Sequence, residues 1–177
     1  GQIIKIKKPI VTELAKGDRL IIKGPNGIGK STLLKSMLSG QSADINPQSR
    51  VGYYSQDFSE LDFHQTAFES LMAISLTKKG QDIYSAAGKF LLNGELLQNK
   101  IGSLSEGQKG LLCYARFTLQ QPGILILDEP TNHINFRHIP IIAKAINGYA
   151  GPIILVSHLP EFVEKIKNLR ELNLENF

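Results

Sequence analysis

Residues 24 to 32 read GPNGIGKST and have the composition of a phosphate-binding loop. They fit the pattern G-x-x-x-x-G-K-[ST], in which glycines let the backbone curl until successive N–H groups point at one anion. Lys30 is placed to reach the β- and γ-phosphates of a nucleotide, and the hydroxyl of Ser31 to bind Mg²⁺. The residues predicted to contact the nucleotide are Gly24, Pro25, Asn26, Gly27, Ile28, Gly29, Lys30, Ser31 and Thr32.

Two adjacent carboxylates follow an apolar run farther along the chain. Residues 124 to 128, ILILD, have the pattern of a buried strand, and Asp128 and Glu129 stand at its carboxyl end. Ligands of α/β sheets bind at this end of the strands. We therefore expect Asp128 to bind Mg²⁺, directly or through water, and Glu129 to polarise the water that attacks a phosphate.

Both motifs require a sheet whose strands end at the same edge. Apolar strands are expected at 20–23, 50–55, 124–128 and 152–157, and alternating strands at 1–8 and 169–175. Helices are expected at 31–39, 139–147 and 160–166. Because strands alternate with helices, the fold class predicted is α/β, with a mostly parallel sheet and helices on its faces.

The stretch from Asp57 to Ser103 shows only helical patterns. Thr66 and Glu69 form a T-x-x-E capping box before one helix. Asp82 can cap a second helix, which Asn93-Gly94 would end. A third helix is expected to open at LSEGQKG, residues 104 to 110. We interpret the helical stretch as a subdomain inserted into the sheet domain.

Length and composition narrow the class of protein. The chain has 177 residues, 42% of them hydrophobic and 20% charged, which is typical of one globular domain. The net charge of +4 is compatible with nucleotides or nucleic acid without requiring either. The single cysteine, Cys113, excludes an internal disulfide framework and fits a reducing compartment. No apolar run approaches the ~20 residues of a membrane-spanning helix, so no direct membrane insertion is expected.

With these motifs in place, the chain resembles the ATP-binding-cassette (ABC) ATPases, whose core is a RecA-like P-loop domain. Gln56, at the end of VGYYSQ, matches the glutamine of the family's Q-loop. Leu104-Ser105-Glu106-Gly107-Gln108 matches the family's signature loop, usually LSGGQ. His158, after the buried strand in LVSH, matches its switch histidine.

The resemblance implies an Mg-dependent ATPase. Glu129, His158 and Gln56 would be the catalytic residues, with Gln56 contacting both Mg²⁺ and the attacking water. Ser31, Gln56 and Asp128 would form the metal site. Hydrolysis by the isolated domain is expected to be weak, because a complete site needs two cassettes.

The signature loop would bind ATP held by a different domain. In the family, ATP lies between the P-loop of one cassette and the signature loop of another, so Ser105, Gly107 and Gln108 would contact its γ-phosphate. Ser105 can also cap the helix, and Gly107 lets the backbone approach closely. The partner would be a second ABC cassette, either in the same full-length chain or in a head-to-tail copy.

The resemblance also implies a domain division. One nucleotide-binding domain would span 1–177, with 1–57 and 104–177 as its ATP-binding core and 58–103 as its helical subdomain. Two positions depart from the family pattern: Glu106 stands where glycine is usual, and Asn135 where aspartate is usual.

The segment PTNH, residues 130 to 133, and the pair Gln108-Lys109 resemble the ABC-F branch. Proteins of that branch carry two cassettes in one chain, lack membrane domains, and act on ribosomes in translation or antibiotic resistance. The branch implies a cytoplasmic, ribosome-associated protein, of which this chain would be the second cassette. Two alternatives stay open: the motor cassette of a membrane transporter, and a sensor that binds ATP and barely turns it over.

Overall fold

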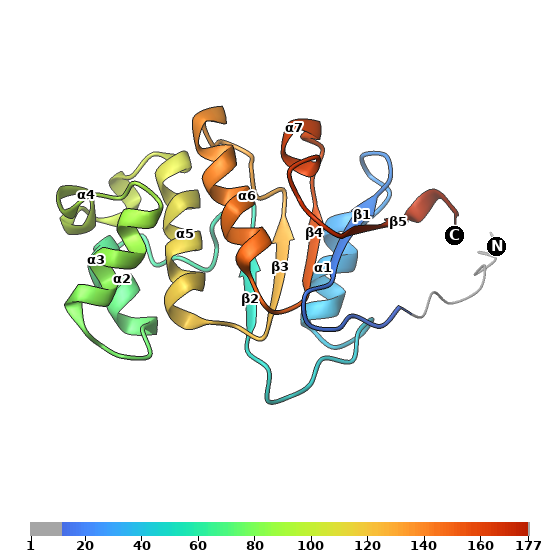
Figure 1. The fold of residues 1–177 in the computed structure, drawn as a ribbon, viewed down its shortest axis with the longest axis horizontal. Coiled ribbons are helices and arrows are strands. Elements are labelled where there is room, and N and C mark those ends of the chain that lie inside the picture. Colours follow the sequence, from blue (N-terminus) through green and yellow to red (C-terminus); the bar gives the residue numbers. More distant parts are fainter. Residues whose placement is uncertain (1–11, 177) are drawn as a thin grey trace.

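The computed structural model describes residues 12–176, and its centre is a five-stranded sheet in the order β2-β3-β4-β1-β5 (Figure 1). Every neighbouring pair is parallel. The strands are β1 (Arg19–Lys23), β2 (Val51–Tyr54), β3 (Ile124–Asp128), β4 (Ile153–Val156) and β5 (Leu169–Asn173). The strand expected at 1–8 lies outside the described residues. The α/β class and the parallel sheet are confirmed.

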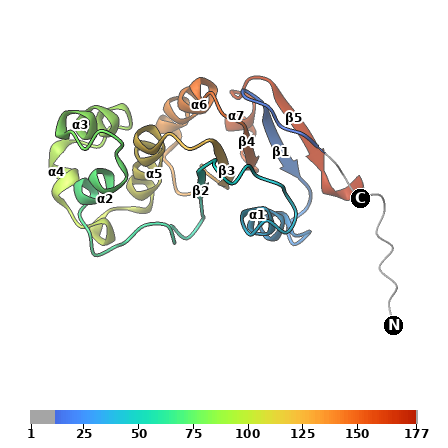
Figure 2. The same ribbon diagram turned by 90° about the horizontal axis from the view of Figure 1, so that it is seen from below.

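Strands β3 and β4 are buried on both faces, because helices cover each side of the sheet. On one face, Leu34 and Met37 of α1 (Lys30–Leu38) pack near Ile126 and Ile154. The opposite face holds the larger core, which includes Ile142 of α6 (Ile139–Gly148). Seen from below, α1 lies on one side of the sheet and α6 on the other (Figure 2). A short helix, α7 (Pro160–Val163), follows β4.

Three helices gather at one end of the molecule, beside α5 (Figure 1). They are α2 (Ala67–Ile74), α3 (Gly80–Lys89) and α4 (Gly94–Gln98), and α5 spans Glu106–Gln120. The helical character expected before the signature loop is therefore observed. The boundaries 58 and 103 of a separate helical subdomain stay a prediction.

The helix caps agree with the sequence in one case and differ in another. The Thr66–Glu69 capping box is present, as predicted. The predicted cap by Asp82 is wrong, because Lys79 precedes α3 and Asp82 instead accepts a hydrogen bond from the Thr77 hydroxyl. Asn93 does not end this helix but caps α4, accepting from the Leu96 amide at 2.9 Å.

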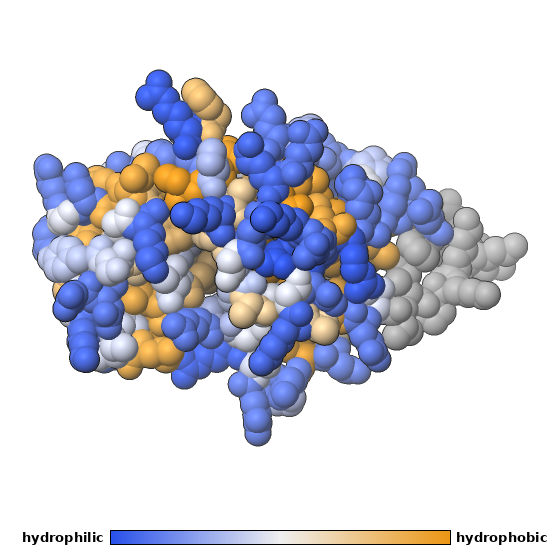
Figure 3. Space-filling view, viewed as in Figure 1, coloured by the Kyte–Doolittle hydropathy of each residue, from blue (hydrophilic) through white to orange (hydrophobic). Residues whose placement is uncertain are grey.

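The surface mixes hydrophilic side chains with scattered apolar patches, as Figure 3 shows for one face. None of the helices within residues 12–176 combines the length and the apolar character that crossing a membrane requires.

Candidate functional site

The predicted phosphate-binding loop connects β1 to α1. Gly24, Gly27 and Gly29 have φ values of 147°, 84° and 103°, which other residue types adopt only with strain. Gly29 is the N-cap of α1, and no side chain of the described residues caps this helix. The first amide groups of α1 are therefore free to donate to an anion, and the helix dipole favours negative charge there.

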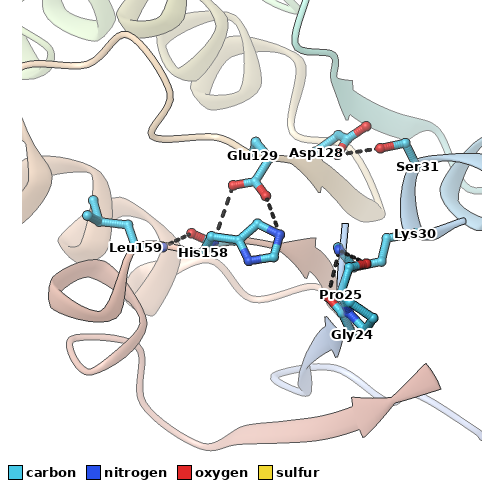
Figure 4. Close-up of polar contacts among 9 residues, drawn as sticks. Gly24, Pro25, Lys30, Ser31, Asp128, Glu129, His158 and Leu159 are labelled. Atoms are coloured by element: carbon cyan, nitrogen blue, oxygen red, sulfur yellow. Dashed lines mark hydrogen bonds and ion pairs between the residues drawn. The ribbon is translucent and has the colours of Figure 1, made fainter. Parts of the chain in front are cut away.

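Lys30 lies across this loop. The residue is 8% exposed, and Nζ donates to the carbonyl oxygens of Gly24 at 2.7 Å and Pro25 at 3.0 Å (Figure 4). These two bonds hold the ammonium group over the loop, where its charge can meet a polyphosphate. Asn26 and Thr32 are exposed on the same segment, and Gly27 and Ile28 complete the turn.

The loop and the acidic strand end meet through one hydrogen bond. The Ser31 hydroxyl donates to Asp128 Oδ1 at 3.2 Å, although 97 positions separate the two residues (Figure 4). A hydroxyl and a carboxylate are oxygen ligands of the kind Mg²⁺ prefers beside phosphates. The two residues therefore fit the metal site that the sequence predicts, with Asp128 buried at the end of β3.

Glu129 follows directly and points toward His158 (Figure 4). Its Oε1 lies 3.3 Å from His158 Nε2, and its Oε2 accepts from the His158 amide at 3.3 Å. The Glu129 side chain is 10% exposed, whereas that of His158 is 52% exposed. Burial raises the pKa of the Glu129 carboxyl above its ordinary value, and the nearby His158 offsets part of that rise. A carboxylate with a raised pKa is a stronger proton acceptor, which suits a group that activates water.

Gln56 is exposed in the turn after β2. Strand β2 runs beside β3, with Tyr54 paired to Leu127, so both strands end at the same edge of the sheet. Gln56 therefore leaves the sheet on the same side as Asp128 and Glu129. This placement is compatible with the role that the family resemblance implies for it.

The segment LSEGQ forms the start of α5. The Ser105 hydroxyl accepts from the Gln108 amide at 3.2 Å, and Gln108 Oε1 accepts from the Ser105 amide at 2.9 Å, so the predicted cap is present as a full capping box. The side chain of Gln108 is thus occupied by the helix itself. The Ser105 hydroxyl keeps its hydrogen for donation to a phosphate, because it serves the cap only as acceptor.

The two residues between Ser105 and Gln108 contact the loop after β3. Glu106 Oε2 lies 2.8 Å from Nδ1 of His133, and both side chains are at least half exposed. A Cβ on Gly107 would come within 2.9 Å of the His133 carbonyl oxygen. The close approach of the His133 backbone therefore requires glycine at position 107, whether or not a phosphate also binds there.

Comparison with known proteins gives the family. The sequence model described as ABC transporter matches residues 8–132, more than half of the chain. The chain belongs to the ABC transporter family. The matched residues include the P-loop, Gln56, the signature loop and Glu129, so the predicted ABC ATPase cassette is confirmed.

The relatives of this cassette include members of sub-family F. It is 35% identical to the putative ATP-binding protein YdiF of Bacillus subtilis over 167 residues, which cover 89% of this chain and 26% of that protein. It is also 35% identical to ATP-binding cassette sub-family F member 3 of Homo sapiens over 155 residues, covering 84% and 22% respectively. The cassette therefore spans about a quarter of the length of these relatives.

A solved structure of a dimeric bacterial ABC transporter cassette shares the fold. It superimposes with a TM-score of 0.73 at 19% identity, covering 92% of this chain and 84% of that one. This likeness concerns the fold alone.

The two regions of the cassette that are predicted to contact nucleotide lie apart. The P-loop between β1 and α1 and the start of α5 are both at the upper edge in Figure 1, on opposite sides of β3. Figure 2 shows the same separation between α1 and α5. Figure 4 shows Lys30, Ser31, Asp128, Glu129 and His158 together. The start of α5, which carries Ser105, Gly107 and Gln108, lies apart from the P-loop.

Sequence reasoning missed the partner of Glu106. His133 was interpreted only as a marker of the ABC-F branch, and nothing in the spacing of the two residues predicts their contact. Asn135, by contrast, can make the same local hydrogen bond as the usual aspartate. Its side-chain oxygen accepts from the Arg137 amide at 3.0 Å and caps a 3₁₀ turn.

Proposed function

We propose that this cassette hydrolyses ATP in a site completed by a second cassette. The observation that carries the proposal is the separation of the signature loop from the other predicted site residues, at the same edge of one sheet. A head-to-tail pair would bring the Ser105 hydroxyl of each cassette to the P-loop of the other. A solved cassette that shares this fold is described as dimeric, which supports the arrangement.

Within one cassette, the proposed mechanism assigns a task to each group. The amides of the P-loop and Lys30 bind the phosphates of ATP. Ser31 and Asp128 would hold Mg²⁺, which would supply positive charge beside the phosphates. Glu129 accepts a hydrogen bond or proton from the attacking water, and Gln56 would contact that water, beside the γ-phosphate, and the metal. His158 contacts the γ-phosphate and keeps the Glu129 carboxylate oriented through the contact between Oε1 and Nε2 at 3.3 Å.

The decisive experiment measures ATPase rate per molecule across a dilution series of the 177-residue chain. If two copies share each site, the specific rate should rise with protein concentration, because pairing follows mass action. A rate that is independent of concentration would contradict a shared site. Loss of hydrolysis at every concentration, with ATP still bound, would favour the sensor alternative.

Ser105 offers a matched pair of variants for the same series. Aspartate and asparagine are both good N-caps, so Ser105→Asp and Ser105→Asn should each preserve the start of α5. Only Ser105→Asp adds a negative charge where the partner's γ-phosphate would lie. We expect Ser105→Asp to remove the gain with concentration and Ser105→Asn to keep most of it, with ATP affinity equal in both.

We further propose that the cassette is part of an ABC-F protein that acts on ribosomes in the cytoplasm, in translation or antibiotic resistance. PTNH at 130–133 and the relatives named as sub-family F members support this setting. Since the relatives are about four times as long, we infer that a second cassette lies in the same full-length protein. Binding of the chain to purified ribosomal subunits, with and without ATP, tests the proposal. Specific retention on membrane-domain proteins instead would favour a transporter motor.

A further inference from the structure

Glu60 is a partly buried carboxylate that none of the proposed steps uses. It stands four positions after Gln56 and accepts two hydrogen bonds from side chains. The hydroxyl of Ser55 donates to its Oε2, and the thiol of Cys113 donates to its Oε1 at 3.3 Å. Both donors are buried, with residue exposures of 4% and 1%. Glu60 thus connects the residue immediately before Gln56 to the middle of α5.

Further contacts fix the turn that surrounds Gln56. The amide and the hydroxyl of Ser59 donate to Ser55 Oγ at 3.1 and 3.2 Å. Phe58 is buried in a left-handed conformation with φ of 53°, and its ring meets Tyr54 edge-on at 5.9 Å between centroids. Gln56 itself is exposed. The contacts of Ser55, Phe58 and Ser59 therefore fix the shape of the turn, and Gln56 stays exposed to solvent.

The Ser55 hydroxyl and the Cys113 thiol are both donors, and the Glu60 carboxylate accepts from each of them. A carboxylate accepts stronger hydrogen bonds than a neutral oxygen does, and each of its two oxygens here meets one donor. Burial, together with the charge of Glu60, raises the pKa of the Cys113 thiol, so the thiol stays protonated and acts as donor. Cys113 lies on the helix that begins with the signature loop.

We propose that Glu60 is a positioning residue for Gln56: by binding Ser55 and Cys113 at once, it fixes the turn through which Gln56 reaches the reacting phosphate and its metal. This inference rests on the proposed function, because that function places Gln56 at the phosphate. Glu60 would act through the turn, by its contacts with Ser55 and Cys113.

A double-mutant cycle tests the link. Single-turnover ATP hydrolysis is measured with the 177-residue chain in excess over ATP, for Glu60→Ala, Gln56→Ala and the double variant. Misplacing a group that positions reactants costs up to about 100-fold, so we expect Glu60→Ala to slow hydrolysis about 10- to 100-fold. The double variant should be no slower than Gln56→Ala alone, because Glu60 acts only through Gln56.

Four controls separate positioning from general damage. Asp62→Ala removes a carboxylate from the same segment and should hydrolyse at the parent rate. Within residues 12–176, the Asp62 carboxylate accepts a hydrogen bond only from the amide of His64, at 3.0 Å. Glu60→Gln keeps one acceptor and should recover part of the loss. Cys113→Ser keeps a donor and should stay close to the parent rate, whereas Cys113→Ala should not. Thermal unfolding of every variant shows whether the fold is retained.

The outcomes distinguish the two proposals. Multiplied losses in the double variant, or a parent rate in a folded Glu60→Ala variant, would overturn the inference and leave the proposed function intact. An unchanged rate in Gln56→Ala would remove Gln56 from the proposed function and the inference with it. If Glu60→Ala unfolds, the comparison of Cys113→Ala with Cys113→Ser decides alone, because Cys113 lies on α5 and neither substitution replaces a residue of the turn. Equal rates for these two variants would overturn the link.

Discussion

The P-loop and the signature loop both precede a helix, yet they satisfy their polar groups in opposite ways. At α1 the N-cap is Gly29, which offers no side chain, and Ser31 bonds Asp128 of a distant strand. At α5, Ser105 and Gln108 cap the helix reciprocally. The P-loop leaves the first amides of α1 available to a ligand. In the signature loop, the side chains of Ser105 and Gln108 already bind amides at the start of α5.

This difference predicts an order of events. The start of α1 can bind an anion with several amides and Lys30, all within one chain. The start of α5 offers chiefly the hydrogen of the Ser105 hydroxyl and the amides that the capping box leaves free. We therefore expect ATP to bind the P-loop first and the signature loop to join afterwards.

The largest expected effect is on ATP hydrolysis and comes from Glu129, which follows β3 at the edge of the sheet where the P-loop lies. Glu129→Gln keeps the shape of the side chain but cannot accept a proton. We expect ATP to bind with parent affinity while hydrolysis slows by about 10²–10⁴-fold, the usual contribution of a positioned acid–base group. Rapid-quench measurement of hydrolysis, beside calorimetry of binding, checks both parts. Hydrolysis at the parent rate would assign the activation of water to another residue.

The next effect concerns affinity. Lys30→Ala removes a charge-assisted contact worth ~1.5–3 kcal/mol, so we expect ATP to bind roughly 10- to 150-fold more weakly. Ser105→Asn should leave affinity unchanged in the same titration. Calorimetry on the two folded variants measures the contrast, and equal affinities would show that the two loops do not differ as described.

A smaller effect should appear in the pH profile. Because the pKa of Glu129 is raised by burial, its carboxylate takes up a proton at a higher pH than an ordinary glutamate of pKa about 4.3. The value of kcat/KM for ATP should therefore fall several-fold on acidification while the fold is still intact. Glu129→Gln binds the same nucleotide but should lack this component. Identical profiles for the two proteins would contradict the assignment.

The smallest effect belongs to the signature loop. An exposed polar contact contributes little, so losing the contact between Glu106 and His133 should cost less than the repulsion that Glu106 exerts on a phosphate. We expect Glu106→Gln to raise the concentration-dependent rate about twofold. His133→Ala leaves the carboxylate without its partner and should lower that rate. A decrease in Glu106→Gln would show that the pair mainly holds the loop in place.

Local signals in the sequence were reliable where the partners are neighbours in the chain. Thr66 with Glu69, and Ser105, could be identified as caps because a cap acts within three residues of itself. The buried strands at 124–128 and 152–157 were predicted because helices cover both faces, which leaves continuous apolar runs. The same runs indicated the parallel sheet and so placed Asp128 at its carboxyl edge.

The same kind of local signal failed where one residue type can begin or end a helix. Asn93 was interpreted as the end of a helix, but its side chain caps the next one, and the chain turns at Leu91 with φ of 60°. Contacts between distant segments left a signal where a motif marks both residues, as for Ser31 and Asp128, and left none elsewhere. Glu60 meets Cys113 from 53 positions away, and only the folded chain shows that they touch.

The backbone of Glu129 is left-handed, with φ of 50°, while its amide donates to the Val156 carbonyl at 2.9 Å. Such a conformation costs a non-glycine residue on the order of 1–3 kcal/mol, and the buried carboxylate adds a desolvation penalty. Asparagine tolerates this backbone and carries no charge. A search for thermostable variants would therefore favour Glu129→Asn, and would select against the residue on which the proposed hydrolysis depends.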